Sequence, residues 1–228
     1  TFDISWNIFC FHLLNNIYIM KNSYSNIFSF NKKILKKTIK NLNNGNIVGL
    51  PTETVYGLGG NAYSKKSIEK IYKLKERPRS NPLIIHYLNL KDASKDIVVN
   101  ERFKKLYARF CPGPITFVLK KRYGSKINPL STAKLKTVAI RFPKHKVIRS
   151  ILKCINFPLA MPSANISSRL SPVNAIDVFD DFKNKLKIII NGGRSRIGIE
   201  STVVDLTGKP KILRTGIISS KETIKNLN

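Results

Sequence analysis

From about residue 32 onward, short apolar runs alternate with amphipathic stretches, and this alternation limits what the chain can fold into. The apolar runs are rich in β-branched and aliphatic residues, which is typical of buried strands. They cover residues 46–50, 83–87, 115–119, 138–142, 159–161, 188–190, 202–206 and 211–213. Amphipathic helices are expected between them, at 34–42, from the N-cap Ser64 to Pro78, from the N-cap Asn100 to Phe110, and at 147–152. The pattern predicts one α/β domain with a twisted sheet, flanking helices and one crevice.

The chain of 228 residues is long enough for one sizeable α/β domain, and it is strongly basic. It has 41 Lys and Arg against 13 Asp and Glu, which gives a net charge of +28. Such a charge favours polyanionic partners, here nucleotide phosphates, pyrophosphate or RNA. A second explanation stays open, because low-GC coding produces chains rich in Lys, Asn and Ile without any selection for binding.

Three scattered cysteines, Cys10, Cys111 and Cys154, form neither a Cys-x-x-Cys pair nor a Cys/His cluster with zinc spacing. We therefore expect no disulfide framework, no structural metal and a reducing cytoplasm. Residues 1–20 are apolar but interrupted by polar residues, and they lack the features of a secretory signal, so no membrane association is expected. We interpret 1–31 as an N-terminal extension, with Met20 as the expected natural start, and 32–228 as the functional domain.

Four loops concentrate polar side chains beside predicted strands or helices, and open α/β sheets bind ligands outside the carboxyl ends of their strands. The loops cover residues 52–60, 75–82, 162–172 and 192–202. The first and last combine hydroxyls with glycines, which let backbone amides approach a ligand. The second carries Lys75, Arg77 and Arg79 on a chain that prolines force to be extended, which suits phosphate oxygens. Each loop taken alone is also typical of an ordinary connection.

Arg141 lies inside the predicted strand 138–142, and a buried guanidinium is costly without a carboxylate partner. We expect that partner to be an Asp or Glu of the protein or a carboxylate of a substrate. His86 ends another predicted strand, where a core-edge histidine with one backbone partner explains it equally well. The sequence shows no Walker or dinucleotide-binding glycine pattern, and no Ser-His-Asp order or paired carboxylates indicate an acyl-transfer or glycosidase centre.

Seven segments follow one another over about residues 45–216: PTETVYGLGGNA, KERPRSNPLIIH, CPGPITFVL, VAIRFPKH, MPSANISSRLSP, GGRSRIGIESTVVD and ILRTG. Together they resemble the YrdC-like family of threonylcarbamoyl-AMP synthases. The resemblance implies a twisted, open, mixed α/β sheet whose flanking helices enclose a large basic cavity. It also implies a nucleotidyltransferase that joins L-threonine, bicarbonate and ATP into threonylcarbamoyl-AMP and releases pyrophosphate. In the cytoplasm that product serves threonylcarbamoyladenosine formation at position 37 of tRNA, through downstream tRNA threonylcarbamoyl-transferase proteins.

The resemblance assigns roles to individual residues of these segments. The catalytic set is Lys75, Arg77, Ser163 and Asn165. The threonine pocket uses Thr54, His86, Arg141, Met161 and Ser201, and Arg141 holds the carboxylate. ATP binding is assigned to Lys75, Arg77, Asn81, Thr137, Ser163, Asn165, Ser171 and Arg214. Mg²⁺ is expected to accompany ATP, and no metal ligand is assigned to the protein.

Two other functions stay open. A non-catalytic module that binds tRNA or double-stranded RNA explains the charge but not the threonine-type pocket. A carbamoyl-transfer domain of the hydrogenase-maturation type shares the same module but normally carries zinc-finger cysteines, which three scattered cysteines do not supply. Longer members of the family continue through a linker into a second domain, whereas this sequence stops at Asn228, soon after the ILRTG segment. It therefore resembles the short, single-domain form of the family, or else it is truncated.

Overall fold

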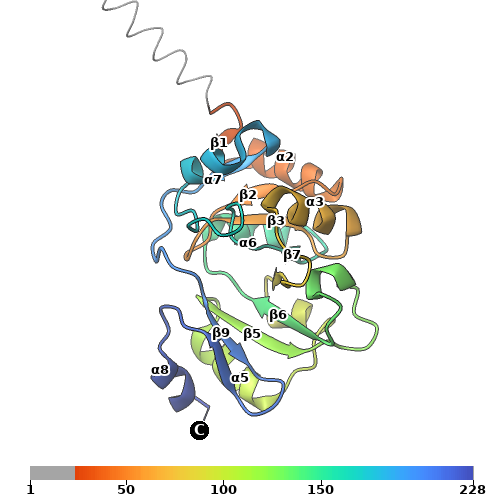
Figure 1. Ribbon diagram of the computed structural model, residues 1–228, viewed down its shortest axis with the longest axis vertical. Helices are drawn as coiled ribbons and strands as arrows, with labels where there is room; N and C mark the ends of the chain where they lie inside the picture. Colours follow the sequence, from red (N-terminus) through yellow and green to blue (C-terminus); the bar gives the residue numbers. More distant parts are fainter. Residues whose placement is uncertain (1–23, 228) are drawn as a thin grey trace, which may run out of the picture.

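The computed structural model describes residues 24–227, and within them ten strands form one mixed sheet (Figure 1). Their order across the sheet is β1-β8-β2-β3-β7-β4-β6-β5-β9-β10. The strands are β1 (Ile27–Ser29), β2 (Val48–Leu50), β3 (Gly57–Asn61), β4 (Ile84–His86), β5 (Ile115–Lys120), β6 (Thr137–Arg141), β7 (Leu159–Ala160), β8 (Ile189–Asn191), β9 (Thr202–Asp205) and β10 (Lys211–Arg214). Parallel and antiparallel pairs alternate irregularly, so the predicted mixed α/β sheet is confirmed.

Helices cover both faces of this sheet. They are α2 (Lys32–Asn43), α3 (Lys65–Lys75), α4 (Leu90–Ala93), α5 (Glu101–Phe110), α6 (Lys146–Lys153), α7 (Ala175–Phe182) and α8 (Ser220–Lys225), with 3-10 turns at Pro129–Thr132 and Lys183–Lys185. The predicted N-caps are confirmed, because the side chain of Ser64 accepts from the Ser67 N–H and that of Asn100 from the Phe103 N–H. No helix within residues 24–227 is long and apolar enough to cross a membrane.

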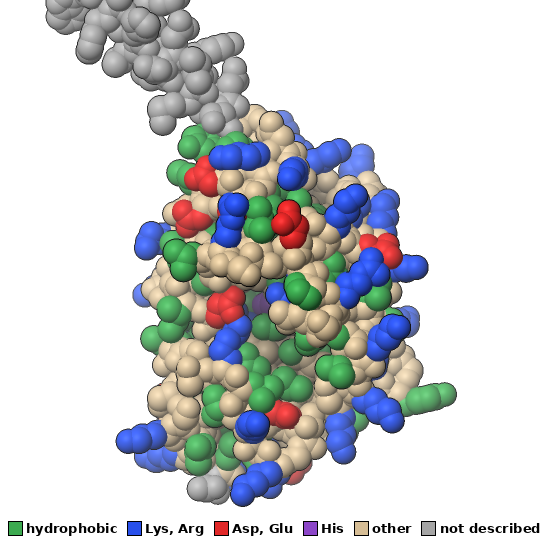
Figure 2. All heavy atoms as spheres, viewed as in Figure 1, with side chains coloured by type: hydrophobic (Ala, Val, Ile, Leu, Met, Phe, Trp, Pro, Cys, Tyr) green, Lys and Arg blue, Asp and Glu red, His purple; other side chains and the backbone are tan. Residues whose placement is uncertain are grey.

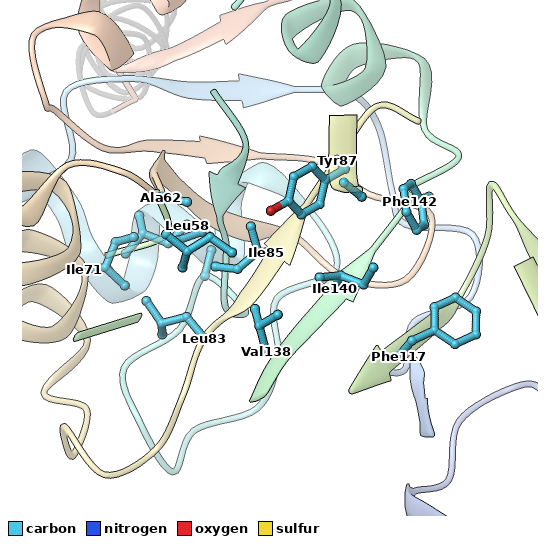
Figure 3. Packing of buried hydrophobic residues seen from close by; sticks show 14 of the residues in the cluster. Leu58, Ala62, Ile71, Leu83, Ile85, Tyr87, Phe117, Val138, Ile140 and Phe142 are labelled. Carbon is cyan, nitrogen blue, oxygen red and sulfur yellow. The ribbon is translucent and has the colours of Figure 1, made fainter. Parts of the chain in front are cut away.

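Side chains that alternate along the strands divide the core into two clusters on opposite faces of the sheet. Ile188 and Ile190 pack with α2 and α6 on one face, whereas Ile189 packs on the other. The second face carries the larger cluster, to which α3, α5 and α7 contribute and part of which Figure 3 shows. The α2 and α6 helices therefore cover one part of the first face, which includes the strands β2, β7 and β8.

Three details differ from the sequence predictions. The first loop ends at Tyr56, because Gly57–Asn61 forms β3 and pairs with both β2 and β7. This strand was not predicted from the sequence because it contains three glycines, and glycine has low strand propensity. The helix that was expected to run to Pro78 ends at Lys75, because Glu76 adopts a left-handed conformation (φ +53°) and caps it.

The predicted N-terminal extension also differs where the structure describes it. Ile27–Ser29 pair in parallel with β8, and the Asn26 side chain donates to the backbone oxygens of Lys183 and Leu186. The folded region therefore begins before residue 32, and the short strand was missed because polar residues surround it. The expected start at Met20, and the rest of the extension up to residue 23, lie outside the described residues.

Candidate functional site

The four polar loops meet through backbone and side-chain hydrogen bonds. Ile197 N and Gly198 N donate to the carbonyls of Glu53 and Thr54, which ties the fourth loop to the first. The third loop joins the first through Ala164 N, which donates to the Tyr56 carbonyl at 2.8 Å. Lys75 Nζ donates to the Ser163 carbonyl at 2.5 Å, and this bond attaches the second loop. These hydrogen bonds show that the four loops, which are distant in the sequence, lie together in space.

A pocket opens between these loops, with an empty volume of about 520 Å³ that includes the part open to solvent. Its walls are formed by Thr52, Val55, Tyr56, Gly57, Arg77, Pro82, Ile84, His86, Arg141, Met161, Pro162, Ser163, Glu200, Ser201 and Arg214. Figure 2 shows a hollow near the middle of this face of the molecule, with basic, acidic and histidine side chains around it.

The pocket lies across a face of the sheet and reaches the carboxyl ends of the parallel strands β4 and β6, whose last residues are His86 and Arg141. Pro82, Ile84 and His86 alternate with the core residues Leu83 and Ile85, so they form a floor along β4. A strand rises about 3.3 Å per residue, so the four residues from Pro82 to His86 span at most about 13 Å, and we call the pocket along them the trough. His86 and its register partner Arg141 lie at one end of this trough, and Pro82 lies at the other.

Arg141 and Glu53 form a buried ion pair at the first end. Arg141 Nη2 lies 2.7 Å from Glu53 Oε1, and Arg141 is only 4% exposed. Glu53 Oε2 also accepts from the backbone N–H groups of Lys144 and His145. Burial would raise the pKa of Glu53, but the charge and hydrogen bond of Arg141 and the backbone donors lower it below 4.5. The carboxylate partner expected for Arg141 is therefore a residue of the protein.

One donor of Arg141 has no partner. Its Nε is buried and makes no hydrogen bond within the described residues, although Arg141 lines the pocket. A buried unpaired donor costs free energy, which an acceptor on a ligand would recover. The guanidinium therefore donates to Glu53 through Nη2, while its Nε stays buried and unpaired in a residue that lines the pocket.

His86 and Ser201 lie beside Arg141. Burial and the charge of Arg141 lower the pKa of His86 to about 3, so the ring is neutral at neutral pH. Its Nδ1 lies 3.3 Å from the Ile84 carbonyl. Ser201 Oγ lies 2.7 Å from Thr116 Oγ1, and Thr116 is the register partner of Arg141. This end of the trough thus combines a guanidinium, a neutral imidazole and a hydroxyl.

Two further arginines line the pocket and are held in place by oxygen acceptors. Arg77 Nε donates to the Asn81 carbonyl at 3.0 Å, and its Nη2 donates to the Pro82 carbonyl at 2.9 Å. Arg214 pairs with Glu200 and donates through Nε to the Ser201 carbonyl at 3.0 Å. Three guanidiniums against one lining carboxylate make the pocket basic, as the resemblance implied.

Lys75 lies behind the pocket wall rather than in it. Its ammonium is buried, with 1% of the residue exposed, and it donates to the carbonyls of Ser163 and Asn165 and to Asn165 Oδ1. The Lys75 carbonyl in turn accepts from Ser167 N at 2.9 Å. Lys75 therefore joins the end of α3 to the loop that carries Ser163.

The sequence-predicted residues divide into two groups. Those that line the pocket are Arg77, His86, Arg141, Met161, Ser163, Ser201 and Arg214. Those that do not are Thr54, Lys75, Asn81, Thr137, Asn165 and Ser171. Thr137 alternates with the core residue Val138 and so faces the same side of β6 as Arg141, four residues away. The individual roles given to all these residues stay predictions.

Glu53 and Glu200 are two charged residues of the site that sequence reasoning did not assign. Glu53 holds Arg141, while Glu200 holds Arg214 and accepts from Ser171 Oγ at 3.1 Å. The need of Arg141 for a carboxylate was visible in the sequence, but 88 residues separate it from Glu53. No group of three or more His, Cys, Asp or Glu within residues 24–227 is arranged to hold a metal ion.

Comparisons with known proteins identify the family to which the chain is similar. The family model Sua5_yciO_yrdC, described as Telomere recombination, matches residues 40–216. A threonylcarbamoyl-AMP synthase of Pyrococcus abyssi (strain GE5 / Orsay) is 45% identical over 173 residues, or 74% of this chain and 49% of that protein. A threonylcarbamoyl-AMP synthase of Bacillus subtilis (strain 168) is 39% identical over 184 residues, or 79% of this chain and 53% of that protein.

A solved structure of a similar protein matches this fold. The crystal structure of P. abyssi Sua5 complexed with L-threonine matches with a TM-score of 0.84 and 38% identity, over 88% of this chain and 60% of that chain. The chain spans about half the length of the two curated relatives.

Proposed function

Because the chain belongs to the Sua5_yciO_yrdC family, we propose that it is a nucleotidyltransferase that makes threonylcarbamoyl-AMP from L-threonine, bicarbonate and ATP. The proposal extends to this chain what the names of its relatives state, and the trough supports it independently. The product would serve threonylcarbamoyladenosine formation at position 37 of tRNA, through downstream transferase proteins. A cytoplasmic setting is part of the proposal.

The position of Arg141 in the pocket wall, together with His86 and Ser201, is the observation that carries this function. A threonine carboxylate at this end would accept hydrogen bonds from the guanidinium of Arg141, and it would leave the Glu53 contact intact. The neutral ring of His86 and the hydroxyl of Ser201 would form hydrogen bonds with threonine, by accepting from its ammonium group or by accepting from or donating to its hydroxyl. The phosphate end would lie about 13 Å away, toward Arg77 and Ser163.

The chemistry needs positioning more than covalent help from the protein. The neutral amine of threonine forms a C–N bond to CO₂ derived from bicarbonate and loses a proton, which leaves a carbamate. A carbamate oxygen then forms a bond to the α-phosphorus of ATP while the bond to the bridging oxygen breaks, and pyrophosphate leaves with that electron pair. Arg77 and Arg214 would stabilise the charge that develops on the phosphoryl oxygens, and the enclosing loops would keep water from the carbamate.

Mg²⁺ is proposed to enter as part of the Mg-ATP substrate. Glu200 is the only carboxylate among the residues that line the pocket, and Arg214 and Ser171 already occupy its oxygens. The donor set therefore fits an ion whose ligands are phosphate oxygens and water rather than side chains.

The test is pyrophosphate release by the purified chain with Mg²⁺, ATP, L-threonine and bicarbonate, in reactions that each omit one component. We expect release only when both L-threonine and bicarbonate are present, together with a threonylcarbamoyl-AMP peak. L-serine and L-valine serve as matched amino-acid controls, because each lacks one group of the threonine side chain. Release that is independent of threonine would contradict the proposal.

A further inference from the structure

Two arginines in the wall of the trough are paired with carboxylates, and the two pairs differ in how far solvent reaches them. The side chains of Arg141 and Glu53 are 5% and 9% exposed, so that pair is buried. The side chains of Arg214 and Glu200 are 36% and 32% exposed. A buried pair is costly to break, whereas a partly exposed pair contributes little to stability. The Arg214–Glu200 pair can therefore open at small cost.

Glu200 uses both of its oxygens on residues that the resemblance assigns to ATP binding. Its Oε2 accepts from Arg214 Nη1, and its Oε1 accepts from Ser171 Oγ at 3.1 Å. Oxygens of carboxylates and of phosphates accept the same hydrogen bonds from guanidinium and hydroxyl groups. Glu200 and a phosphate group would therefore compete for Arg214 and Ser171.

Arg214 is also held by contacts that do not involve the side chain of Glu200. Its Nε donates to the Ser201 carbonyl at 3.0 Å, and its Nη2 donates to Ser201 Oγ at 3.1 Å. The backbone that follows Arg214 packs closely on this segment, because a Cβ at Gly216 would lie 2.5 Å from Thr202 N. Removal of the charge of Glu200 should thus leave the guanidinium in place and make its Nη1 available to another acceptor.

Glu200 has room to turn away from Arg214. It lies between the trough and a solvent-open groove that is also lined by Gly198 and Ile199. Two other carboxylates in this groove, those of Asp177 and Asp181, already accept from backbone N–H groups. Because the groove is open to water, a carboxylate that turned into it would be hydrated, and no buried charge would result.

We propose that Glu200 competes with phosphate for Arg214 and Ser171, and that it thereby sets the affinity of the trough for phosphorylated ligands. The inference rests on the proposed function, because that function places the phosphates of ATP near Arg214. The carboxylate weakens the binding of negatively charged ligands, since like charges repel at close range. After pyrophosphate has left, Glu200 pairs with Arg214 again and so favours release of the adenylate.

The experiment measures the binding of ATP, AMP and adenosine to the full chain by calorimetry, without Mg²⁺ and at about 50 and 200 mM salt. The test variant is Glu200→Gln, which keeps the size of the side chain and removes its charge. The control is Glu69→Gln, which removes the same charge from a surface pair outside the pocket. Arg214→Gln and the double variant complete a cycle that measures how far the two side chains act together.

We expect Glu200→Gln to bind ATP at least about threefold more tightly than the wild type, AMP with a smaller gain, and adenosine equally. The gain should shrink at the higher salt, because salt screens partly exposed charges. In the Arg214→Gln background the gain should be at least about twofold smaller, because the competition for the guanidinium is gone. Glu69→Gln should bind all three ligands as the wild type does.

Three results would overturn the proposal. Unchanged or weaker ATP binding by Glu200→Gln would show that the carboxylate does not compete with phosphate. An equal change for adenosine would indicate a disturbed pocket, since adenosine carries no phosphate. A gain of the same size in the Arg214→Gln background would show that Glu200 does not act through Arg214.

Turnover separates this inference from the proposed function. In turnover, Glu200→Gln should lower the KM for ATP and strengthen inhibition by added pyrophosphate, whereas a disturbed pocket would raise that KM. If the wild type binds ATP but makes no product, and Glu200→Gln binds ATP more tightly, the proposed function fails and the role of Glu200 stands. If product forms normally and ATP binding is unchanged in Glu200→Gln, the role of Glu200 alone fails.

Discussion

The Arg141–Glu53 pair combines two charges that would each be costly to bury alone. Both oxygens of Glu53 are used, one by Arg141 and the other by the backbone N–H groups of Lys144 and His145. Breaking a buried pair on one side leaves an uncompensated charge, which typically costs about 3 to 5 kcal/mol. Glu53 thus stabilises the fold and orients the guanidinium that faces the trough.

The substitution Glu53→Gln should therefore lower the free energy of unfolding by about 3 kcal/mol in urea denaturation. It should also raise the KM for L-threonine by at least about tenfold, or about 1.4 kcal/mol, because Arg141 is no longer held. The matched control is Glu69→Gln, which removes only a surface pair with 3.9 Å between its charges and should change stability by less than about 1 kcal/mol. An unchanged stability and KM in Glu53→Gln would contradict the role given to Glu53.

The Arg141–Glu53 pair also predicts how the stability of the fold depends on pH in acid. The folded-state pKa of Glu53 lies below the unfolded value of 4.5, so its contribution is complete above pH 4.5 and is lost as the pH falls through the folded value. The stability gap between the wild type and Glu53→Gln should stay constant above pH 4.5 and narrow below it. Urea midpoints of both proteins across this range check the sign, and a gap that widens in acid would refute it.

The lowered pKa of Lys75 predicts how the stability of the fold changes at alkaline pH. Burial, with a smaller contribution from the charge of Arg77, lowers its pKa from 10.5 to about 8 in the folded state. Between these values the unfolded chain holds a proton that the folded chain has released, so stability should rise with pH. Relative to Lys75→Met, the wild type should therefore gain stability from pH 8 to pH 10.5. Parallel stability profiles for the two proteins would contradict this.

Arg77 tests the phosphate end of the trough. Arg77→Ala should abolish adenylate formation while the far-ultraviolet circular dichroism and the urea midpoint stay near those of the wild type. Arg79→Ala is the control, because Arg79 is exposed on the same loop and does not line the pocket. Retained activity in Arg77→Ala, or equal losses in both variants, would argue against a direct role.

At the scale of elements, β3 shows how backbone packing shapes the pocket. A Cβ at Gly57 would lie 2.5 Å from Met161 Cγ, and Met161 is part of the pocket wall. Gly57→Ala should displace Met161, lower stability by about 1 to 3 kcal/mol and raise the KM for L-threonine. Gly208→Ala is the control, since nothing lies within 4 Å of its Cβ position. Equal urea midpoints and KM values for the two variants would contradict the prediction.

Elements with clear local signals were predictable, and the others were not. The strands β5 and β6 were predicted from their runs of β-branched residues, and the starts of α3 and α5 were predicted from the N-cap residues Ser64 and Asn100. The α7 helix was missed, although Asn174 and Asp177 form a capping box and Val178, Phe179 and Phe182 have helical spacing. The strand β3 forms because it pairs with β2 and β7, and the strand propensity of its own residues does not predict this pairing.

At the scale of the whole molecule, the family resemblance assigned residues of the four loops to common sites, but it did not show what each residue contacts. The resemblance assigned Lys75 and Ser163 to one catalytic set. Only the fold shows that the buried ammonium of Lys75 donates to the backbone carbonyl of Ser163, behind the pocket wall. The Glu53–Arg141 contact joins residues 88 positions apart, which no local pattern specifies. The trough across the sheet face likewise follows from strand register, since His86 and Arg141 are partners in adjacent strands.

The most direct test of the central claim is the fate of the carbon of bicarbonate. Wild-type protein would be incubated with Mg²⁺, ATP, L-threonine and ¹³C-labelled bicarbonate, and the nucleotide products would be separated and weighed by mass spectrometry. The account predicts threonylcarbamoyl-AMP that carries the label, in amounts equal to the pyrophosphate released. Pyrophosphate released without a labelled adenylate, or no nucleotide turnover by folded protein, would contradict it.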